Sequence, residues 1–91
     1  MVGSVGGLTF DPPNTVYSIN LGWPIEVFCL GEGPLIWTFN SNKIDSDLDL
    51  DVYTLRFNQN RTKLAILSLR DHGVYTCHGP RESLNVRVRV H

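Results

Sequence analysis

The chain has 91 residues, of which 42% are hydrophobic and 19% are charged, and its formal net charge is -1. This length fits one domain and leaves no room for a second independent core. The charge balance argues against nucleic acid as a partner, because nucleic-acid binders carry a strong basic excess. Residues 1–7, rich in glycine, are interpreted as a flexible or vector-derived lead-in, and residues 8–91 as a single domain.

Short β-rich runs separated by turn residues recur along the chain, and none of useful length has the helical period. In the first half these runs cover residues 8–10, 15–20, 25–30 and 35–39. Pro12 and Pro13 mark a bend between the first two runs, because proline cannot donate to a strand ladder. In the run 35–39, Trp37 shares the inward face and is the predicted core anchor, whereas Phe28 and Ile36 point outward from their runs.

The second half continues the pattern with runs at 53–57, around Leu64 and Ile66, at 74–78 and at 84–90. In the last run Val86 and Val88 face inward, so the arginines between them face outward. Seven to eight such runs without a strand–helix–strand signal predict an antiparallel sandwich or barrel.

Two cysteines favour the sandwich. Cys29 lies on an early run and Cys77 on the penultimate one, each in phase with apolar inward neighbours. Their thiols can therefore meet across a core between two sheets, with Trp37 placed to pack on the bridge. A disulfide closing a loop of about 50 residues would add ~3–4 kcal/mol of stability.

Cys29, Trp37 and the segment Asp71-His-Gly-Val-Tyr-Thr-Cys77 resemble the immunoglobulin-superfamily pattern of Cys, Trp and Asp-x-Gly-x-Tyr-x-Cys. The resemblance extends over residues 8–90 and implies an immunoglobulin-like Greek-key β-sandwich of two antiparallel sheets, close to the intermediate set.

The same segment implies a tight corner with three structural roles. Gly73 is expected to relax the backbone there, and Tyr75 to bond upstream backbone through its hydroxyl. Asp71 is expected to cap the corner or to pair with a cation such as Arg56.

Cys29 and Trp37 are only eight residues apart, where many immunoglobulin domains use more than ten. The segment 29–37 resembles the membrane-distal immunoglobulin domains of receptor tyrosine kinases of the platelet-derived and vascular endothelial growth factor receptor group. This second resemblance implies a growth-factor receptor as the parent protein.

Two sets of outward residues are candidates for binding protein. Arg81, Arg87 and Arg89 form a basic stripe on the last hairpin, and arginine is favoured at interfaces because its planar fork contacts carboxylates in pairs. Trp23 and Phe28 form an apolar patch. The plainer alternatives are a solvated stripe and a patch covered by a neighbouring loop.

Four carboxylates alternate along residues 45–51, as calcium ligands can. The spacing fails the EF-hand test, because Leu50 stands where glycine is needed and Arg56 where the closing glutamate is needed. A solvated acidic edge that discourages sheet pairing is the preferred interpretation.

Asn60-Arg61-Thr62 is an N-glycosylation acceptor triplet, and with the paired cysteines it favours an extracellular compartment. No spacing organises the histidines, serines and cysteines into a catalytic or zinc site. We therefore expect neither an enzyme nor a bound metal or cofactor.

These observations predict an extracellular recognition module of a cell-surface receptor or adhesion protein, whose parent can be membrane-anchored. The expected partners are a protein ligand or neighbouring immunoglobulin domains, together with weak self-association between the arginine stripe and the acidic run 45–51 of another copy. The alternative is a cytoplasmic intermediate-set module of a sarcomeric or cytoskeletal protein, with free thiols and a role as spacer or docking unit.

Overall fold

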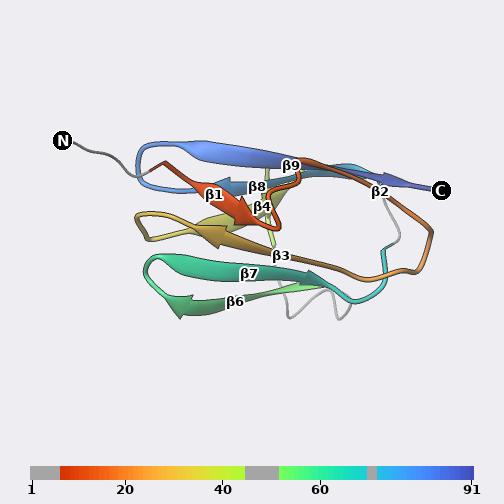
Figure 1. The fold of residues 1–91 in the computed structure, drawn as a ribbon, viewed down its shortest axis with the longest axis horizontal. Coiled ribbons are helices and arrows are strands. Elements are labelled where there is room, and N and C mark those ends of the chain that lie inside the picture. Colours follow the sequence, from red (N-terminus) through yellow and green to blue (C-terminus); the bar gives the residue numbers. More distant parts are fainter. Residues whose placement is uncertain (1–6, 45–51, 70–71) are drawn as a thin grey trace.

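Two β-sheets stack face to face in the computed structural model, which describes residues 7–44, 52–69 and 72–91 (Figure 1). The described residues form nine strands and no helix. The strands are β1 (Thr9–Asp11), β2 (Val16–Ile19), β3 (Ile25–Leu30), β4 (Ile36–Phe39), β5 (Asn42–Lys43), β6 (Val52–Asn58), β7 (Arg61–Ile66), β8 (Gly73–His78) and β9 (Ser83–Val90). The predicted all-β sandwich of two sheets is confirmed.

The chain changes sheets at the bend that the prolines mark. One sheet has the strand order β1-β3-β7-β6 and the other the order β2-β9-β8-β4-β5. β1 therefore belongs to the four-stranded sheet and β2 to the five-stranded sheet, and Pro12 and Pro13 lie between them. β2 runs parallel to β9, whereas every other described pairing is antiparallel.

Strand alternation places one apolar row from each sheet in the interior. Trp37 is 2% exposed and its ring stacks on that of Phe10 with the centroids 5.7 Å apart. The other buried apolar residues are Leu8, Ile25, Val27, Cys29, Leu35, Leu64, Ala65, Ile66, Leu69, Tyr75, Cys77, Val86 and Val88. The inward phases of the runs at 25–30, 35–39 and 84–90 are those expected from the sequence.

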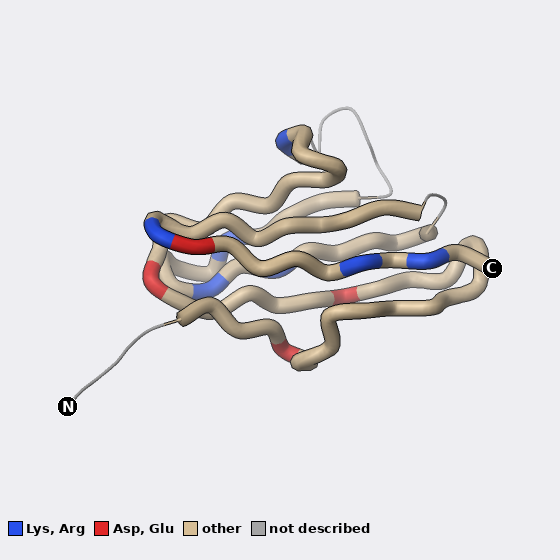
Figure 2. The backbone as a smooth tube through the Cα atoms, turned by 90° about the horizontal axis from the view of Figure 1, so that it is seen from above, with Lys and Arg blue, Asp and Glu red and all other residues tan. Residues whose placement is uncertain are grey.

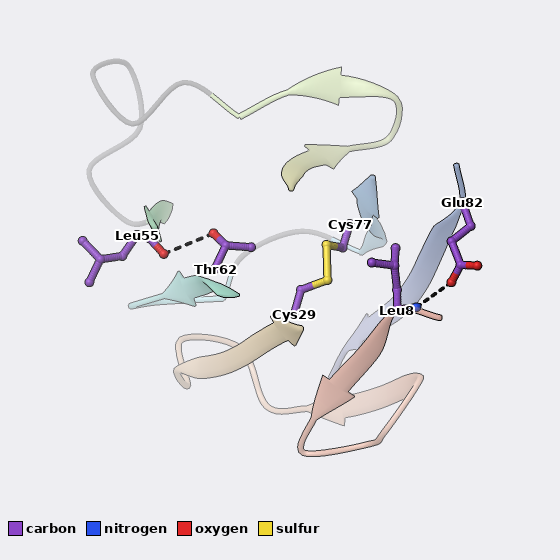
Figure 3. The surroundings of a disulfide bond; sticks show 6 residues. All are labelled: Leu8, Cys29, Leu55, Thr62, Cys77 and Glu82. Carbon is purple, nitrogen blue, oxygen red and sulfur yellow. Dashed lines mark hydrogen bonds between the residues drawn. A yellow bond between two sulfur atoms is a disulfide. The ribbon is translucent and has the colours of Figure 1, made fainter. Parts of the chain in front are cut away.

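A disulfide joins the two sheets through this core. Cys29 in β3 is bonded to Cys77 in β8, with their Cα atoms 6.6 Å apart (Figure 3). Trp37 lies opposite Cys77 in the β4–β8 register, so the indole and the bridge belong to the same packed layer.

A glycine is required at position 73 because a neighbouring ring leaves no room for a side chain. It begins β8, and its φ lies outside the left-handed region. A Cβ atom there would lie 2.3 Å from Cε1 of Phe39, whose ring packs against Tyr75 with the centroids 4.6 Å apart. Close approach of an aromatic ring therefore explains this glycine better than the backbone freedom expected from the sequence.

Tyr17 in β2 has a perturbed acidity. Burial raises the pKa of its phenol, and the negative charge of Asp11 raises it further, while an interaction with the Asn14 side chain acts in the opposite direction. The neutral phenol is thus favoured by the folded state.

Candidate protein-binding surfaces

The outer face of the five-stranded sheet carries two of the arginines predicted to bind protein. Arg87 and Arg89 are exposed on β9, while Val86 and Val88 beside them are buried. Both arginines lie close to the C-terminus in sequence, and Figure 2 shows basic positions on the strand that leads to the end marked C. Burial of the valines therefore fixes the guanidinium groups on the outer surface.

A shallow hollow of about 350 Å³ lies between these arginines and the start of β8. Its lining residues are His72, Gly73, Val74, Arg87, Val88 and Arg89. Nδ1 of His72 accepts a hydrogen bond of 3.0 Å from the amide of Val90, which anchors the imidazole at the rim. Aliphatic groups next to two cations suit an acidic side chain that has apolar neighbours.

The rest of this face is mostly polar. The hydroxyl of Thr76 donates to Oδ1 of Asn85 at 2.7 Å, and the Thr38 hydroxyl contacts Nε2 of His78 at 2.9 Å. Ile36 is 44% exposed beside them, which confirms its predicted outward direction.

Arg81 lies apart from the other two arginines, in the loop between β8 and β9. It lines a separate hollow of about 220 Å³ together with Leu8 and Glu82. A carboxylate oxygen of Glu82 accepts the amide proton of Leu8, so the loop is tied to the start of β1 (Figure 3). The stripe of three arginines expected from the sequence is thus a pair on β9 and one loop residue.

An aromatic and cationic cluster occupies the outer face of the opposite sheet. The rings of Phe28 and Phe57 are stacked with their centroids 5.8 Å apart. Cζ of Arg61 lies 4.6 Å from the Phe28 centroid and 5.0 Å from that of Phe57. Nζ of Lys63 lies 5.9 Å from the Phe28 centroid and 3.5 Å from a carboxylate oxygen of Glu26. Stacking of cations on aromatic faces favours this arrangement.

Trp23, predicted to extend a patch around Phe28, precedes β3 and is 59% exposed. Its carbonyl accepts the amide proton of Leu69 at 3.0 Å. In the described part of the chain, Phe28 makes its ring contacts with Phe57, Arg61 and Lys63 and makes none with Trp23.

The predicted glycosylation triplet lies at the β6–β7 turn. Asn60 is exposed, and its Oδ1 accepts a hydrogen bond of 3.3 Å from the amide of Gly33. Thr62 is buried, and its hydroxyl donates to the carbonyl of Leu55 at 3.1 Å (Figure 3). The acceptor amide therefore faces solvent, and sugar attachment there stays a prediction.

Two of the sequence predictions lie outside the described residues. These are the role of Asp71, including its pairing with Arg56, and the acidic run 45–51. Within residues 7–44, 52–69 and 72–91, no group of three His, Cys, Asp or Glu side chains is arranged to hold a metal ion. The same ranges contain no helix of the length and apolarity needed to cross a membrane.

Solved structures share this architecture. The Ig-like domain 714–804 of human obscurin-like protein 1 superposes with a TM-score of 0.70 at 17% identity, covering 97% of this chain and 88% of that chain. This chain has an immunoglobulin-like fold. Domain I10 of titin gives a TM-score of 0.69 at 14% identity, covering 93% of this chain and 99% of that domain.

The N-terminal Ig1-2 module of the Drosophila receptor protein tyrosine phosphatase DLAR gives a TM-score of 0.73 at 16% identity. The match covers 92% of this chain and 48% of the DLAR module. No protein-family model and no curated protein sequence matches the chain.

In this immunoglobulin-like domain, the sequence predicted that Phe28 points outward. It did not predict that Phe57, Arg61 and Lys63 are the neighbours of Phe28. A signal was present, because Leu55 and Phe57 alternate with polar residues in the run 53–57. The alternation did not show which of the two faces would be buried, and the structure leaves Leu55 and Phe57 on the outside.

Proposed function

We propose that the chain is an extracellular protein-recognition module of a cell-surface receptor or adhesion protein, with no catalytic role. One observation carries the proposal: Arg87 and Arg89 project from the outer face of the five-stranded sheet around a hollow with aliphatic lining. No carboxylate within the described ranges forms a salt bridge with either arginine. Both are therefore available to an acidic partner surface.

Substitution on this face leaves the core intact, which is the property a binding face needs. The inward neighbours Val86 and Val88 hold β9 in place through packing that does not involve the arginine side chains. Exposed charges of this kind steer association with an oppositely charged partner.

The extracellular setting is supported by the bond between Cys29 and Cys77, because disulfides persist in oxidising compartments. The exposed side chain of Asn60, the predicted glycosylation acceptor, also supports an extracellular setting. Within this setting, the short interval between Cys29 and Trp37 favours a growth-factor receptor as parent.

A second candidate is an intermediate-set module of a muscle or cytoskeletal protein. The structural similarity to titin and to an obscurin-like protein favours it, whereas the similarity to a receptor phosphatase favours the first. The two differ in their cysteine chemistry, since the second is expected to keep Cys29 and Cys77 as free thiols.

A binding experiment with purified ectodomains tests the recognition face. The domain is displayed in clustered form on an array of secreted and cell-surface ectodomains, alongside Arg87→Glu with Arg89→Glu and the control Lys43→Glu. An ectodomain recognised through this face should lose at least about tenfold in affinity with the double variant, and its association should become less salt-dependent. Lys43→Glu should retain binding, because Lys43 lies on the edge strand β5. Unchanged binding by a double variant with wild-type melting behaviour would remove this face from the interface.

A further inference from the structure

We propose that a second copy of this chain docks face to face on the outer face of the four-stranded sheet. The contact surface, here called the aromatic–cation face, consists of Glu26, Phe28, Leu55, Phe57, Arg61 and Lys63. It lies on the side of the sandwich opposite Arg87 and Arg89, and the inference does not depend on the function proposed for them.

Apolar side chains that are open to solvent flank Lys63 in the middle of the aromatic–cation face. Leu55 is 44% exposed and Phe57 is 48% exposed, and both belong to the edge strand β6. Leu55 lies opposite Lys63, which in turn lies opposite Phe28, so the three strands contribute to one row. Neighbouring apolar side chains at these exposures gain free energy when another surface covers them.

The backbone positions of the unpaired cation and of the exposed carboxylate lie on opposite sides of the Phe28–Lys63 pair. Arg61 lies opposite Leu30 at one end of the β3–β7 register, and Glu26 lies opposite Ala65 toward the other end. Leu30 and Glu26 are four positions apart along β3, a distance of roughly 13 Å between their backbone positions. The Arg61 guanidinium reaches back over the Phe28 and Phe57 rings, and the Glu26 carboxylate lies 3.5 Å from Nζ of Lys63. The unpaired cation and the exposed carboxylate are therefore displaced from each other along the strands.

Such a surface is complementary to itself when the strands of two copies run antiparallel. A twofold axis across the strands brings Arg61 of each copy to Glu26 of the other, while Phe28, Leu55 and Phe57 meet in between. An isologous contact of this kind forms both ion pairs at once. This reciprocity favours a second copy of the chain as the occupant of the face.

The side chain of Arg61 is already restricted in the free chain, before any contact forms. Its guanidinium lies over the rings of Phe28 and Phe57, which restricts its side chain before binding. It forms no salt bridge with a described carboxylate, whereas Lys63 is already paired with Glu26. The side chain of Glu26 nevertheless keeps 58% of its surface exposed, so its carboxylate can accept a second cation.

The size of the face implies a weak dimer. Six side chains per copy cover less area than the roughly 800 Å² per partner of a standard interface. Asp11 in β1, opposite Phe28, marks the edge of the apolar row. Association is therefore to be measured at protein concentrations up to about 1 mM.

A reciprocal charge swap tests the proposal. Protein made in bacteria under oxidising conditions is studied by sedimentation equilibrium and by the dilution dependence of NMR spectra. Wild-type protein should dimerise reversibly, and Arg61→Glu or Glu26→Arg alone should weaken association at least about tenfold, because each places like charges together. An equimolar mixture of the two single variants should restore it as a heterodimer. The double variant should restore the homodimer.

Two further variants separate this contact from others. Phe57→Ser should weaken association without restoration by any charge change. Arg87→Glu with Arg89→Glu should leave association unchanged, which distinguishes this contact from the one expected from the sequence between the arginine stripe and the acidic run 45–51. Circular dichroism and melting curves establish that each variant is folded. Wild-type protein that stays monomeric at about 1 mM, a dimer insensitive to Arg61→Glu, or a mixture that stays monomeric would each overturn the proposal. Loss of the dimer in the Arg87 and Arg89 variant would overturn it in favour of contact through the other sheet.

Discussion

Trp37→Ala is expected to destabilise the domain by ~3–5 kcal/mol, the usual cost of truncating a large buried aromatic side chain. Trp37 is 2% exposed, stacks on Phe10 with the centroids 5.7 Å apart, and lies opposite Cys77 in the β4–β8 register. Its removal therefore opens a cavity beside the disulfide. Each 1 kcal/mol lost from the free energy of unfolding lowers the melting temperature of a domain this size by roughly 4–8 °C. A decrease of at least about 12 °C is thus expected.

A conservative variant refines the measurement. Nε1 of Trp37 is buried and has no hydrogen-bond partner among the described residues, and an unpaired buried donor opposes folding. Trp37→Phe removes this N–H and keeps an aromatic ring, so it should cost roughly half as much as Trp37→Ala or less. Denaturant unfolding of both variants gives the free energies. The reference is a variant with substitutions in the acidic run 45–51, expected to change stability by less than about 0.5 kcal/mol. Comparable losses of stability in the reference and in Trp37→Ala would contradict the role of Trp37 as the core anchor.

Three further predictions concern the bridge, a close contact and a buried phenol. Replacing Cys29 and Cys77 by alanine should lower the free energy of unfolding by about 4 kcal/mol, because the bond spans 48 positions and closes a long loop; denaturant titration showing no loss would contradict this. Gly73→Ala should lower the free energy of unfolding by about 1–3 kcal/mol, because the added methyl group overpacks against Phe39. Adding Phe39→Leu to this variant should recover part of the lost stability. Unchanged stability in Gly73→Ala would disprove the steric role. Because the fold raises the pKa of Tyr17, the unfolded state loses its proton first, so stability should fall as the pH rises above about 10. Phenolate absorbance follows the titration, and a Tyr17→Phe variant with an identical pH profile would exclude this cause.

The core and the disulfide could be predicted because both follow from strand phase. Ile25, Val27 and Cys29 repeat every second residue, and an alternation of this kind assigns the inward face once one member is known to be buried. Arg87 and Arg89 followed from the same argument, since the valines between and beside them could only be core residues.

The pairing of segments distant in sequence could not be predicted in the same way. The parallel alignment of β2 with β9 and the position of Arg61 over Phe28 and Phe57 depend on which strands become neighbours. Alternation within a single strand carries no information about that choice. Arg81 is a related case, because an exposed arginine before the last run fits a loop or a strand equally well.

The thiol state of the full-length protein in the cells that produce it shows whether the domain is an extracellular module closed by a disulfide. The cells are quenched in acid, free thiols are alkylated, and the peptides containing Cys29 and Cys77 are identified by mass spectrometry without reduction. One cross-linked pair of peptides is expected, with no alkylation at either cysteine. Two alkylated cysteines in protein taken from living cells would contradict it and favour the cytoskeletal alternative.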